Sequence, residues 1–430
     1  MSMDRRRFTG IFAGLLAGAA TPAVRRAAAE PAQGPDAPDV PASIRNLRPL
    51  AGGVTPISAA ERQARIEQAR RLMHEAGMDA LVLEPGSSLY YYTAVGWGLS
   101  ERPFVAVMSA QGEMAYVCPA FEEARAREQV GPGATVRAWQ EDESPYRLVA
   151  GILRDLGQTT GRIGIEERAR FFVFDGLRQE APGAQLVRAD QVTTGCRMIK
   201  SPAELALLQR ANDITIAAGR AAFAELREGM SPAELARNMS AAMSRLGGAE
   251  AGALVVFGAY TAFPHGTVQP QQLRVGDVVL VDSGCSVEGY HSDVTRTTVF
   301  GRPTQRQTDV WNLERRAQDA AFRAAQVGAT CASVDDAARQ VITEAGFGPD
   351  YRVPGLPHRT GHGIGLDGHE APNFVRGNSL RLAPGMCFSD EPTISIYGEF
   401  GIRLEDCLHI TEDGPRFFTP QSEAIDRPFG

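Results

Sequence analysis

The feature that most constrains this chain is a set of four carboxylates and one histidine in its last third. The set consists of Asp282, Asp293, His362, Glu391 and Glu405. Four carboxylates in one place repel each other and lose hydration, so no fold gathers them for stability alone. Cations remove both penalties, and a pair of divalent metals around a shared water suits this ligand set. The sequence therefore predicts a two-metal centre, provided that the fold brings the five residues together.

A predicted β-hairpin would pair the first two carboxylates. Two runs rich in β-branched residues flank a Ser-Val-Glu-Gly stretch that is suited to a tight turn. If the turn centres between Val287 and Glu288, Asp282 lies directly opposite Asp293. Directly opposed residues on antiparallel strands share one face of the sheet. The hairpin is therefore expected to present both side chains to the same site.

A second hairpin would pair the two glutamates. Its turn is expected at Gly398, between two further strand-like runs. This turn places Glu391 opposite Glu405, again on one face. Two hairpins that each present a carboxylate pair are consistent with a single site between them.

Histidines gather near these hairpins in the sequence. Of the seven in the chain, three fall within residues 357–370, where glycines around His362 allow close backbone approach. His265 stands in a turn-like Phe-Pro-His-Gly context. His265, His358 and His369 are expected to act as neutral hydrogen-bond donors or proton shuttles beside a metal-bound water. Structural roles are expected for the remaining histidines, His74, His291 and His409.

Seven short motifs carry a resemblance to a known family. In chain order they are Phe-Pro-His-Gly, Val-Asp-Ser-Gly, Ser-Asp-Val-Thr-Arg-Thr, Gly-His-Gly-Ile-Gly, His-Glu, Asp-Glu-Pro and Arg-Leu-Glu-Asp. In these motifs and their order, the second half resembles the M24 or "pita-bread" metallopeptidases, which include aminopeptidase P, prolidase and methionine aminopeptidase. The resemblance implies a creatinase-like α/β N-terminal domain and an α+β catalytic domain. The catalytic domain would have a curved, mainly antiparallel sheet backed by helices.

The resemblance also implies a role for each ligand. Asp293 and Glu405 would bridge both metals, and Asp282 would chelate one of them. His362 and Glu391 would complete the other metal site. Manganese is expected first, with cobalt, zinc or iron as alternatives, because imidazole with carboxylates suits these ions better than magnesium.

The implied reaction is hydrolysis of a peptide bond after an N-terminal residue, in most cases before proline. A hydroxide shared by the two metals would attack the scissile carbonyl, and Glu391 would take its proton. His265 and His369 would hydrogen-bond the substrate carbonyl and the developing oxyanion. His358 and Arg403 would orient the substrate or support Glu405. The sequence leaves open whether the peptide substrate is a dipeptide (prolidase activity) or a longer chain (aminopeptidase P activity).

Two other classes of function compete with this interpretation. One keeps the fold with different chemistry, as in a creatinase-like C–N hydrolase or a sulfoniopropionate lyase. The other is a non-catalytic binding module on the same fold. All five ligands are present, and Gly284 rather than an acidic residue follows Asp282 by two positions. Both observations favour the peptidase.

Substrate recognition and assembly give two further expectations. Trp97 belongs to the most aromatic stretch of the first half, residues 90–103. It is expected either to line a subsite for a proline ring or to be a packing residue, and the sequence leaves both open. The resemblance implies an obligate homodimer or homotetramer.

Composition and local patterns divide the chain into four parts. These are a twin-arginine signal peptide (1–29), a flexible leader (30–56), an α/β domain (57–196) and the catalytic domain (197–430). The signal predicts a periplasmic or secreted protein without a membrane anchor after cleavage. The formal charge of −7, without basic clusters in the body, argues against a nucleic-acid partner. The six cysteines lack metal-binding spacing and are expected to be mostly buried thiols.

Helix signals in the second domain are specific. Ser-Pro-Ala-Glu occurs at Ser201 and again at Ser231, and each copy supplies an N-cap, a proline at the first helical position and a glutamate that can close a capping box. A third helix is expected near residues 333–345. In the first domain, strand-like and helix-like runs alternate over residues 80–187, as in an α/β sheet.

Overall fold

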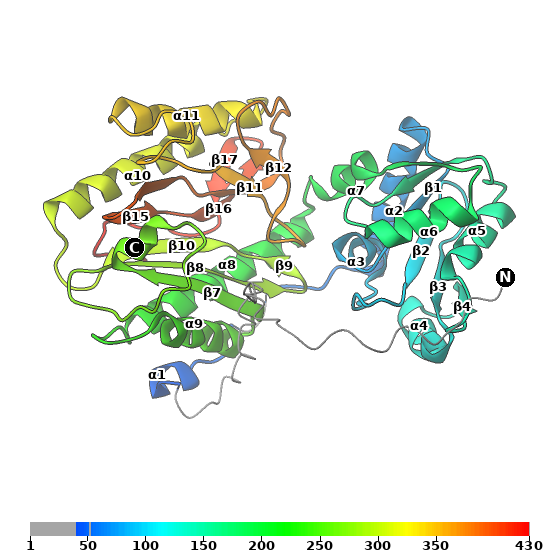
Figure 1. Ribbon diagram of the computed structural model, residues 1–430, viewed down its shortest axis with the longest axis horizontal. Coiled ribbons are helices and arrows are strands. Elements are labelled where there is room, and N and C mark those ends of the chain that lie inside the picture. Colours follow the sequence, from blue (N-terminus) through cyan, green and yellow to red (C-terminus); the bar gives the residue numbers. More distant parts are fainter. Residues whose placement is uncertain (1–39, 51–52, 430) are drawn as a thin grey trace, which may run out of the picture.

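The computed structural model describes residues 40–50 and 53–429, and these form two lobes joined at one side (Figure 1). The first lobe contains one mixed sheet. The second contains antiparallel sheets with long helices on two sides. The expected fold class, an α/β domain followed by an α+β domain, is confirmed.

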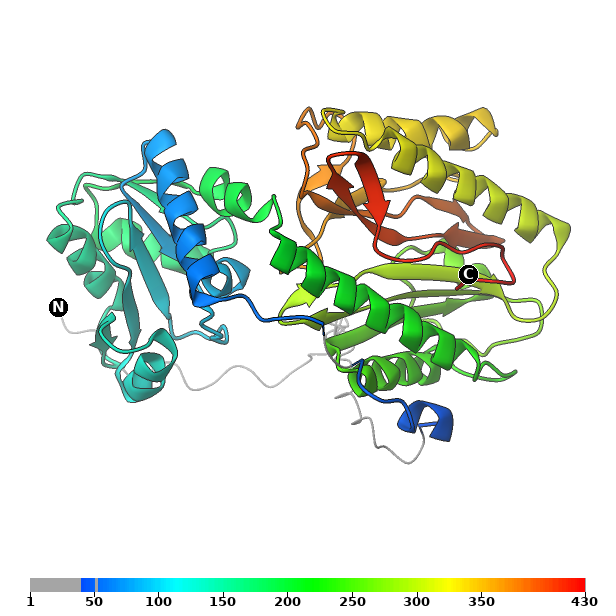
Figure 2. The same ribbon diagram turned by 180° about the vertical axis from the view of Figure 1, so that it is seen from behind.

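The first domain is a six-stranded sheet in the order β4-β3-β2-β1-β5-β6. Its strands are β1 (Ala80–Leu83), β2 (Val105–Ser109), β3 (Ala115–Pro119), β4 (Thr135–Trp139), β5 (Arg162–Ile165) and β6 (Gln185–Arg188). Its helices are α2 (Ala59–Glu75), α3 (Ser87–Thr93), α4 (Glu123–Val130), α5 (Pro145–Asp155), α6 (Phe171–Glu180) and α7 (Asp190–Arg197). Helices α5 and α6 cover one face and α2 covers the other (Figures 1 and 2).

Three elements of this domain were not predicted. Strand β4 is an edge strand with mostly half-exposed residues, so it lacks the apolar run that marks the buried strands. Helices α3 and α7 span seven and eight residues, which is too short for a clear helical period. The predicted strand at Ala80–Leu83 coincides with β1, whose four residues are all buried.

The second domain packs three antiparallel sheets between two helix pairs. Its helices are α8 (Pro202–Phe223), α9 (Pro232–Leu246), α10 (Gln305–Ala324) and α11 (Cys331–Glu344). Its strands are β7 (Ala249–Phe257), β8 (Val278–Val287), β9 (Tyr290–His291), β10 (Val294–Val299), β11 (Gly361–Gly363), β12 (Glu370–Phe374), β13 (Cys387–Asp390), β14 (Thr393–Ile396), β15 (Phe400–Arg403), β16 (Asp406–Thr411) and β17 (Gly414–Phe417). A short 3₁₀ helix, η2 (Gly258–Ala262), follows β7 in this domain, and another, η1 (Ala120–Glu122), precedes α4 in the first domain. Helices α8 and α9 lie on one side and α10 and α11 on the other (Figure 1).

The helix starts follow the expected capping chemistry. The Ser201 hydroxyl accepts the Glu204 N–H, and the Glu204 carboxylate accepts the Ser201 N–H, which completes a capping box at α8. Ser231 caps α9 in the same way through its hydroxyl. Helix α10 was not predicted, although Thr304 and Gln307 form a capping box that would have marked its start.

The first hairpin has a different register from the one predicted. Asp282 pairs with Thr295, not with Asp293. The turn lies at Glu288 and Gly289, where φ is +51° and +81°, so it is a two-residue turn of the kind that needs a positive φ at both positions. The alignment is therefore displaced by two residues. A displacement by two keeps every side chain on its original face, so Asp293 becomes a diagonal neighbour of Asp282 and can still reach the same site.

The second hairpin has the predicted register. The pairs Thr393–Arg403 and Asp390–Asp406 have the alignment that places Glu391 opposite Glu405. The two glutamates lie where one antiparallel sheet ends and the next begins. The N–H of Glu391 donates to the Thr360 carbonyl at 2.8 Å, and the N–H of Glu405 donates to the Thr295 carbonyl at 3.2 Å. These two hydrogen bonds, formed where the ladder is interrupted, tie the second hairpin to the strands that carry the other ligands.

Part of the expected flexible leader is ordered. Within its described residues, α1 (Ala42–Arg45) packs against the second domain, and Ile44 is fully buried in the same cluster as Val40 and Met239. Burial of these apolar side chains outweighs the Pro-rich and Ala-rich composition that suggested flexibility. The predicted signal peptide, 1–29, lies outside the described residues.

The cysteine prediction is confirmed, because all six are buried free thiols. In the part of the chain that the structure describes, no helix is long and apolar enough to cross a membrane.

Candidate metal centre

The structure brings the five predicted ligands together at the junction of the sheets. Asp282 lies in β8, Asp293 directly before β10, His362 in β11, Glu391 directly after β13 and Glu405 directly before β16. Their donor atoms form two groups, each within 4.8 Å: Asp282, Asp293 and Glu405 in one, and His362, Glu391 and Glu405 in the other. Glu405 belongs to both groups. Two donor groups that share one carboxylate match the requirement of a dinuclear centre.

His362 presents one defined nitrogen to the site. Its Nδ1 lies 3.0 Å from the Gly363 carbonyl, so Nδ1 carries the proton and donates. Nε2 is then free to act as a donor to a metal, 3.1 Å from Glu391 Oε1 and 3.7 Å from Asp293 Oδ2. A backbone carbonyl that orients a ligating histidine is typical of metal sites.

Burial, followed by charge repulsion, sets the electrostatics of the centre. Burial and the nearby carboxylates of Glu405, Asp282 and Glu391 raise the pKa of Asp293 well above its ordinary value. Burial and the same kind of repulsion raise the pKa of Glu405. Burial would also raise the pKa of Glu391. Without a metal, however, a second proton on His362 Nε2 donates to Glu391 and adds a positive charge, and this brings the pKa of Glu391 below its ordinary value. Negative charge is therefore in excess in the site.

One unpartnered oxygen shows where a cation fits. Glu405 is 1% exposed, and its Oε1 is buried without a hydrogen-bond partner. Its Oε2 accepts the Thr295 hydroxyl at 2.6 Å. A buried carboxylate oxygen without a partner is costly, whereas a divalent cation at this point would satisfy it and relieve the repulsion. The donor set present therefore fits a pair of divalent ions.

Arg403 supports two ligands from behind. Its guanidinium is 2% exposed and donates to Asp282 Oδ2 at 2.7 Å. It also donates from Nε to the Thr295 hydroxyl at 3.0 Å, and that hydroxyl in turn holds Glu405. The contact with Glu405 that the sequence suggested is therefore indirect, and the direct contact is with Asp282.

The three remaining histidines of the prediction surround the centre at different depths. The ring of His369 lies 3.8 Å from that of His362, centroid to centroid, and its donor atom also falls within 4.8 Å of those of His362 and Asp293. Burial, His362 and Arg359 lower the pKa of His369 to about 4, so its ring is neutral. His358 is held by the Arg359 carbonyl at 2.7 Å and the Thr393 hydroxyl at 3.0 Å.

His265 lies on the outer side of this group. It is exposed, and its charge contributes to the lowered pKa of His358, whose main cause is burial. The Pro264 carbonyl beside it accepts a hydrogen bond from Arg403 at 3.0 Å, which ties the loop to the centre.

Trp97 packs in the core of the first domain and is not part of the metal centre. It is 9% exposed, and its ring stacks on Phe104 with 4.5 Å between centroids. It borders a separate cavity of about 700 Å³ between the domains, opposite Glu250 and His291. None of the five ligands lines that cavity.

Sequence reasoning missed several polar side chains that hold the ligands. Ser389 accepts the His362 N–H at 3.0 Å and donates to Glu391 Oε1 at 3.2 Å. Thr295 links Arg403 to Glu405. Neither residue type stands out in a strand, because serine and threonine are common there; only the observed pairing of strands reveals them.

Comparison with known proteins agrees with this geometry. Residues 206–412 match the metallopeptidase family M24, and residues 65–199 match the creatinase/prolidase N-terminal domain. The chain is similar to the probable dipeptidase PepE of Mycobacterium tuberculosis, with 36% identity over 79% of this chain and 89% of the relative. It is 32% identical to an Xaa-Pro dipeptidase of Lactobacillus helveticus, over 82% and 96% of the two chains.

A solved structure shows the same likeness. The dipeptidase PepE of Mycobacterium ulcerans superposes with a TM-score of 0.80 at 34% identity, covering 86% of this chain and 99% of its own. The predicted resemblance is thereby confirmed, and the family implies divalent metal ions. The chain belongs to metallopeptidase family M24 and is an enzyme that acts on peptides.

Proposed function

We propose that this enzyme hydrolyses the peptide bond of Xaa-Pro dipeptides at a dinuclear metal centre. The observation that carries the proposal is the pair of donor groups that meet at Glu405. A pair of divalent ions bound there would supply an activated water and a Lewis acid for the scissile carbonyl. Manganese is the first candidate, and cobalt, zinc and iron suit the same donors.

The side chains of the centre divide the remaining work. Glu391 stays ionised beside His362 and accepts the proton of the attacking water. His369, neutral at physiological pH, donates a hydrogen bond to the developing oxyanion, and His265 does so from the outer side. Arg403 holds Asp282, and through Thr295 it holds Glu405, so that both carboxylates keep their orientation.

The choice of dipeptides rests on the relatives. The Lactobacillus helveticus protein is named an Xaa-Pro dipeptidase, and both PepE proteins are named dipeptidases. These names do not support a creatinase-like hydrolase, a sulfoniopropionate lyase or a binding module. For assembly and location the proposal is an exported homodimer or homotetramer, supported by the family resemblance and by the twin-arginine motif near the N-terminus.

A substrate panel tests the proposal. Metal-free enzyme is reconstituted separately with manganese, cobalt, zinc and iron, and each form is assayed on Xaa-Pro dipeptides and Xaa-Pro-Yaa tripeptides. The expected result is turnover of dipeptides that exceeds turnover of tripeptides with at least one metal. Faster tripeptide cleavage would make it an aminopeptidase P. No hydrolysis of either class with any metal would contradict the proposed function.

A further inference from the structure

One basic residue differs from all the others in this chain. Of the 44 lysines and arginines, only Lys200 is a lysine. It lies between α7, the last helix of the first domain, and α8, the first helix of the second. It is also deeply buried, with a side chain 2% exposed. A lysine is rarely buried without a partner of opposite charge.

The partner of Lys200 is Glu370, directly after His369. Lys200 Nζ lies 2.6 Å from Glu370 Oε1, and Arg197 donates to Glu370 Oε2 and to Asp367. The side chain of Glu370 is 7% exposed. Burial would raise the pKa of Glu370, but Lys200 and Arg197 outweigh it and keep that pKa below its ordinary value. Three buried charges thus meet where the two domains join.

The loop between the two active-site histidines folds around the Glu370 carboxylate. A Cβ on Gly365 would lie 2.6 Å from Glu370 Oε1, so a larger residue at this position would have to displace the carboxylate that Lys200 and Arg197 hold. The same loop starts at His362 and ends at His369, whose rings are 3.8 Å apart. The position of one ring relative to the other therefore depends on how Glu370 is held.

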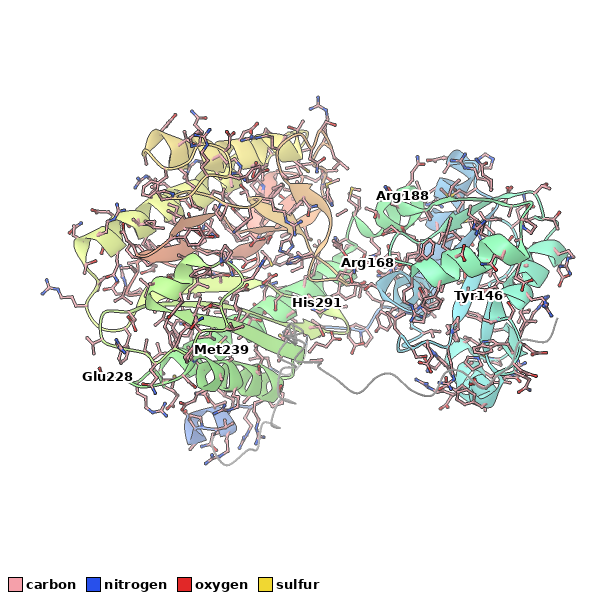
Figure 3. All side chains as sticks on the ribbon, in the orientation of Figure 1. Tyr146, Arg168, Arg188, Glu228, Met239 and His291 are labelled. Carbon is pink, nitrogen blue, oxygen red and sulfur yellow. The ribbon has the colours of Figure 1, made fainter. Side chains whose placement is uncertain are left out.

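A second cation of the first domain holds the loop from its other side. Arg168 donates to the His369 carbonyl at 2.8 Å and pairs with Asp367 Oδ1 at 2.7 Å. Figure 3 shows Arg168 at the edge of the first domain that faces the second. Its side chain is 54% exposed, so it contributes less than the buried pair at Glu370.

We propose that Lys200 is a positioning residue for the peptidase reaction: with Arg197 it anchors Glu370 and so fixes His369 against the metal centre. A lysine suits this place because its compact ammonium fits beside the guanidinium of Arg197, where a second planar guanidinium would need more room. The segment that joins the two domains thereby contributes to the reaction without contacting the substrate. The inference rests on the proposed function for its kinetic test, and its structural test is independent of turnover.

The kinetic test uses Lys200→Met, which keeps the length of the side chain and removes its charge. The kcat for an Xaa-Pro dipeptide is expected to fall at least 10-fold, while KM changes less than threefold and metal content per chain stays at the parent level. A kcat within twofold of the parent would overturn the proposal. Loss of metal would also overturn it, because Lys200 would then support the ligands and not His369.

A double variant separates positioning from stability. Lys200→Met leaves the buried Glu370 with Arg197 as its one cation, which destabilises the fold. A low kcat in this variant could then come from unfolded protein. Lys200→Met/Glu370→Gln removes the unbalanced charge, and its thermal midpoint is expected to recover. A positioning role predicts that kcat remains low in this variant, because the loop has lost its anchor. Recovery of kcat together with the thermal midpoint would reduce Lys200 to a stability role.

Hydrogen exchange gives the readout that needs no turnover. In the double variant, backbone amides of residues 363–370 are expected to exchange at least 10-fold faster, while those of residues 278–287 in the ligand strand β8 keep the parent rate. Arg178→Met is the control, because Arg178 pairs with Asp175 on the exposed surface of α6. If the parent enzyme cleaves no Xaa-Pro dipeptide, the proposed function fails. The exchange result still tests whether Lys200 anchors the loop. Parent-like exchange of residues 363–370 in the double variant would contradict the positioning role of Lys200.

Discussion

Arg403 Nη2 lies 2.7 Å from Asp282 Oδ2, so a buried guanidinium holds a carboxylate of the candidate metal centre in place. A charge-assisted hydrogen bond of this length orients the carboxylate and lowers the cost of burying it. The same guanidinium reaches Glu405 through Thr295. The geometry of the candidate metal centre therefore depends on a residue outside its donor groups.

Removal of this support should weaken metal binding without abolishing it. For Arg403→Ala we expect metal affinity to fall about 10- to 100-fold, the range seen when partners of ligands are lost. Titration of metal into the metal-free protein measures this change. Arg306→Ala is a matched control, because Arg306 pairs with Glu399 on the exposed tip of the second hairpin. An unchanged metal affinity in Arg403→Ala would show that Asp282 and Glu405 keep their orientation without Arg403.

Asp293 and Glu405 are expected to be needed by both ions. Asp293→Asn or Glu405→Gln removes a charge that two cations would share, so metal and activity should be lost together. Elemental analysis of the purified variants, with dipeptide turnover, tests this expectation. Glu399→Gln, an exposed change in the same region, should leave both unchanged. Two metals per chain with near-normal turnover in either ligand variant would refute the bridging assignment.

The metal-free protein should become less stable as pH rises. The pKa values of Asp293 and Glu405 are raised in the folded state, so each carboxyl prefers to be protonated there. A raised acid contributes stability below its ordinary pKa of about 4, and that contribution is lost as pH rises toward the folded value. The pKa of Glu391 is lowered, so its contribution is lost only at pH values below its ordinary pKa. Burial also raises the pKa values of Glu314 and Asp390, which therefore act in the same direction as Asp293 and Glu405.

Thermal midpoints of the chelator-treated protein between pH 5 and pH 8 measure this dependence. The midpoint is expected to fall with rising pH, and bound divalent metal should remove the part of the fall that comes from Asp293 and Glu405. Metal-free Glu405→Gln should show a weaker dependence, since it lacks one of the repelling charges. A metal-free midpoint that rises across this range would contradict the predicted electrostatics.

His265 and His369 should affect the reaction more than metal binding. For His265→Ala and His369→Ala we expect kcat to fall about 10²- to 10³-fold, the usual cost of a lost oxyanion donor. Metal content should stay unchanged in both. His369 needs this test most, because its nitrogen also falls within ligand distance of Asp293 and His362. Lost metal in His369→Ala would make it a ligand. His74→Ala, on the exposed side of α2, is the control.

Trp97 should contribute to stability and not to substrate binding. Its indole stacks on Phe104 and lies under the Arg125 guanidinium, 4.2 Å from the ring centroid. Trp97→Ala should therefore lower the free energy of unfolding by about 3 kcal/mol, as for other large buried side chains. Denaturant unfolding measures this loss, and KM for Xaa-Pro dipeptides should not change. A raised KM with intact stability would return Trp97 to the substrate site.

The sequence alone predicted which five residues would converge, because a metal site best explains four carboxylates and a histidine in this pattern. It also predicted the second hairpin correctly, since Gly398 marks the turn and the strands on both sides are apolar. It predicted the strand pairing of the first hairpin with a register error of two residues, since Asp282 pairs with Thr295 and not with Asp293. The reason is that Glu288 adopts a positive φ, which is uncommon for a residue other than glycine, so the turn was placed one residue too early.

The tertiary structure decided how these residues are held. Convergence of Asp282, Asp293 and Glu405 depends on pairing between strands that are distant in the chain, and a local pattern carries no information about such pairing. The same is true of the ion pair between Arg403 and Asp282. The chemical type of each side chain can be taken directly from the sequence. The orientation of the carboxylates and the hydrogen bonds that support them come from contacts that exist only after the chain has folded.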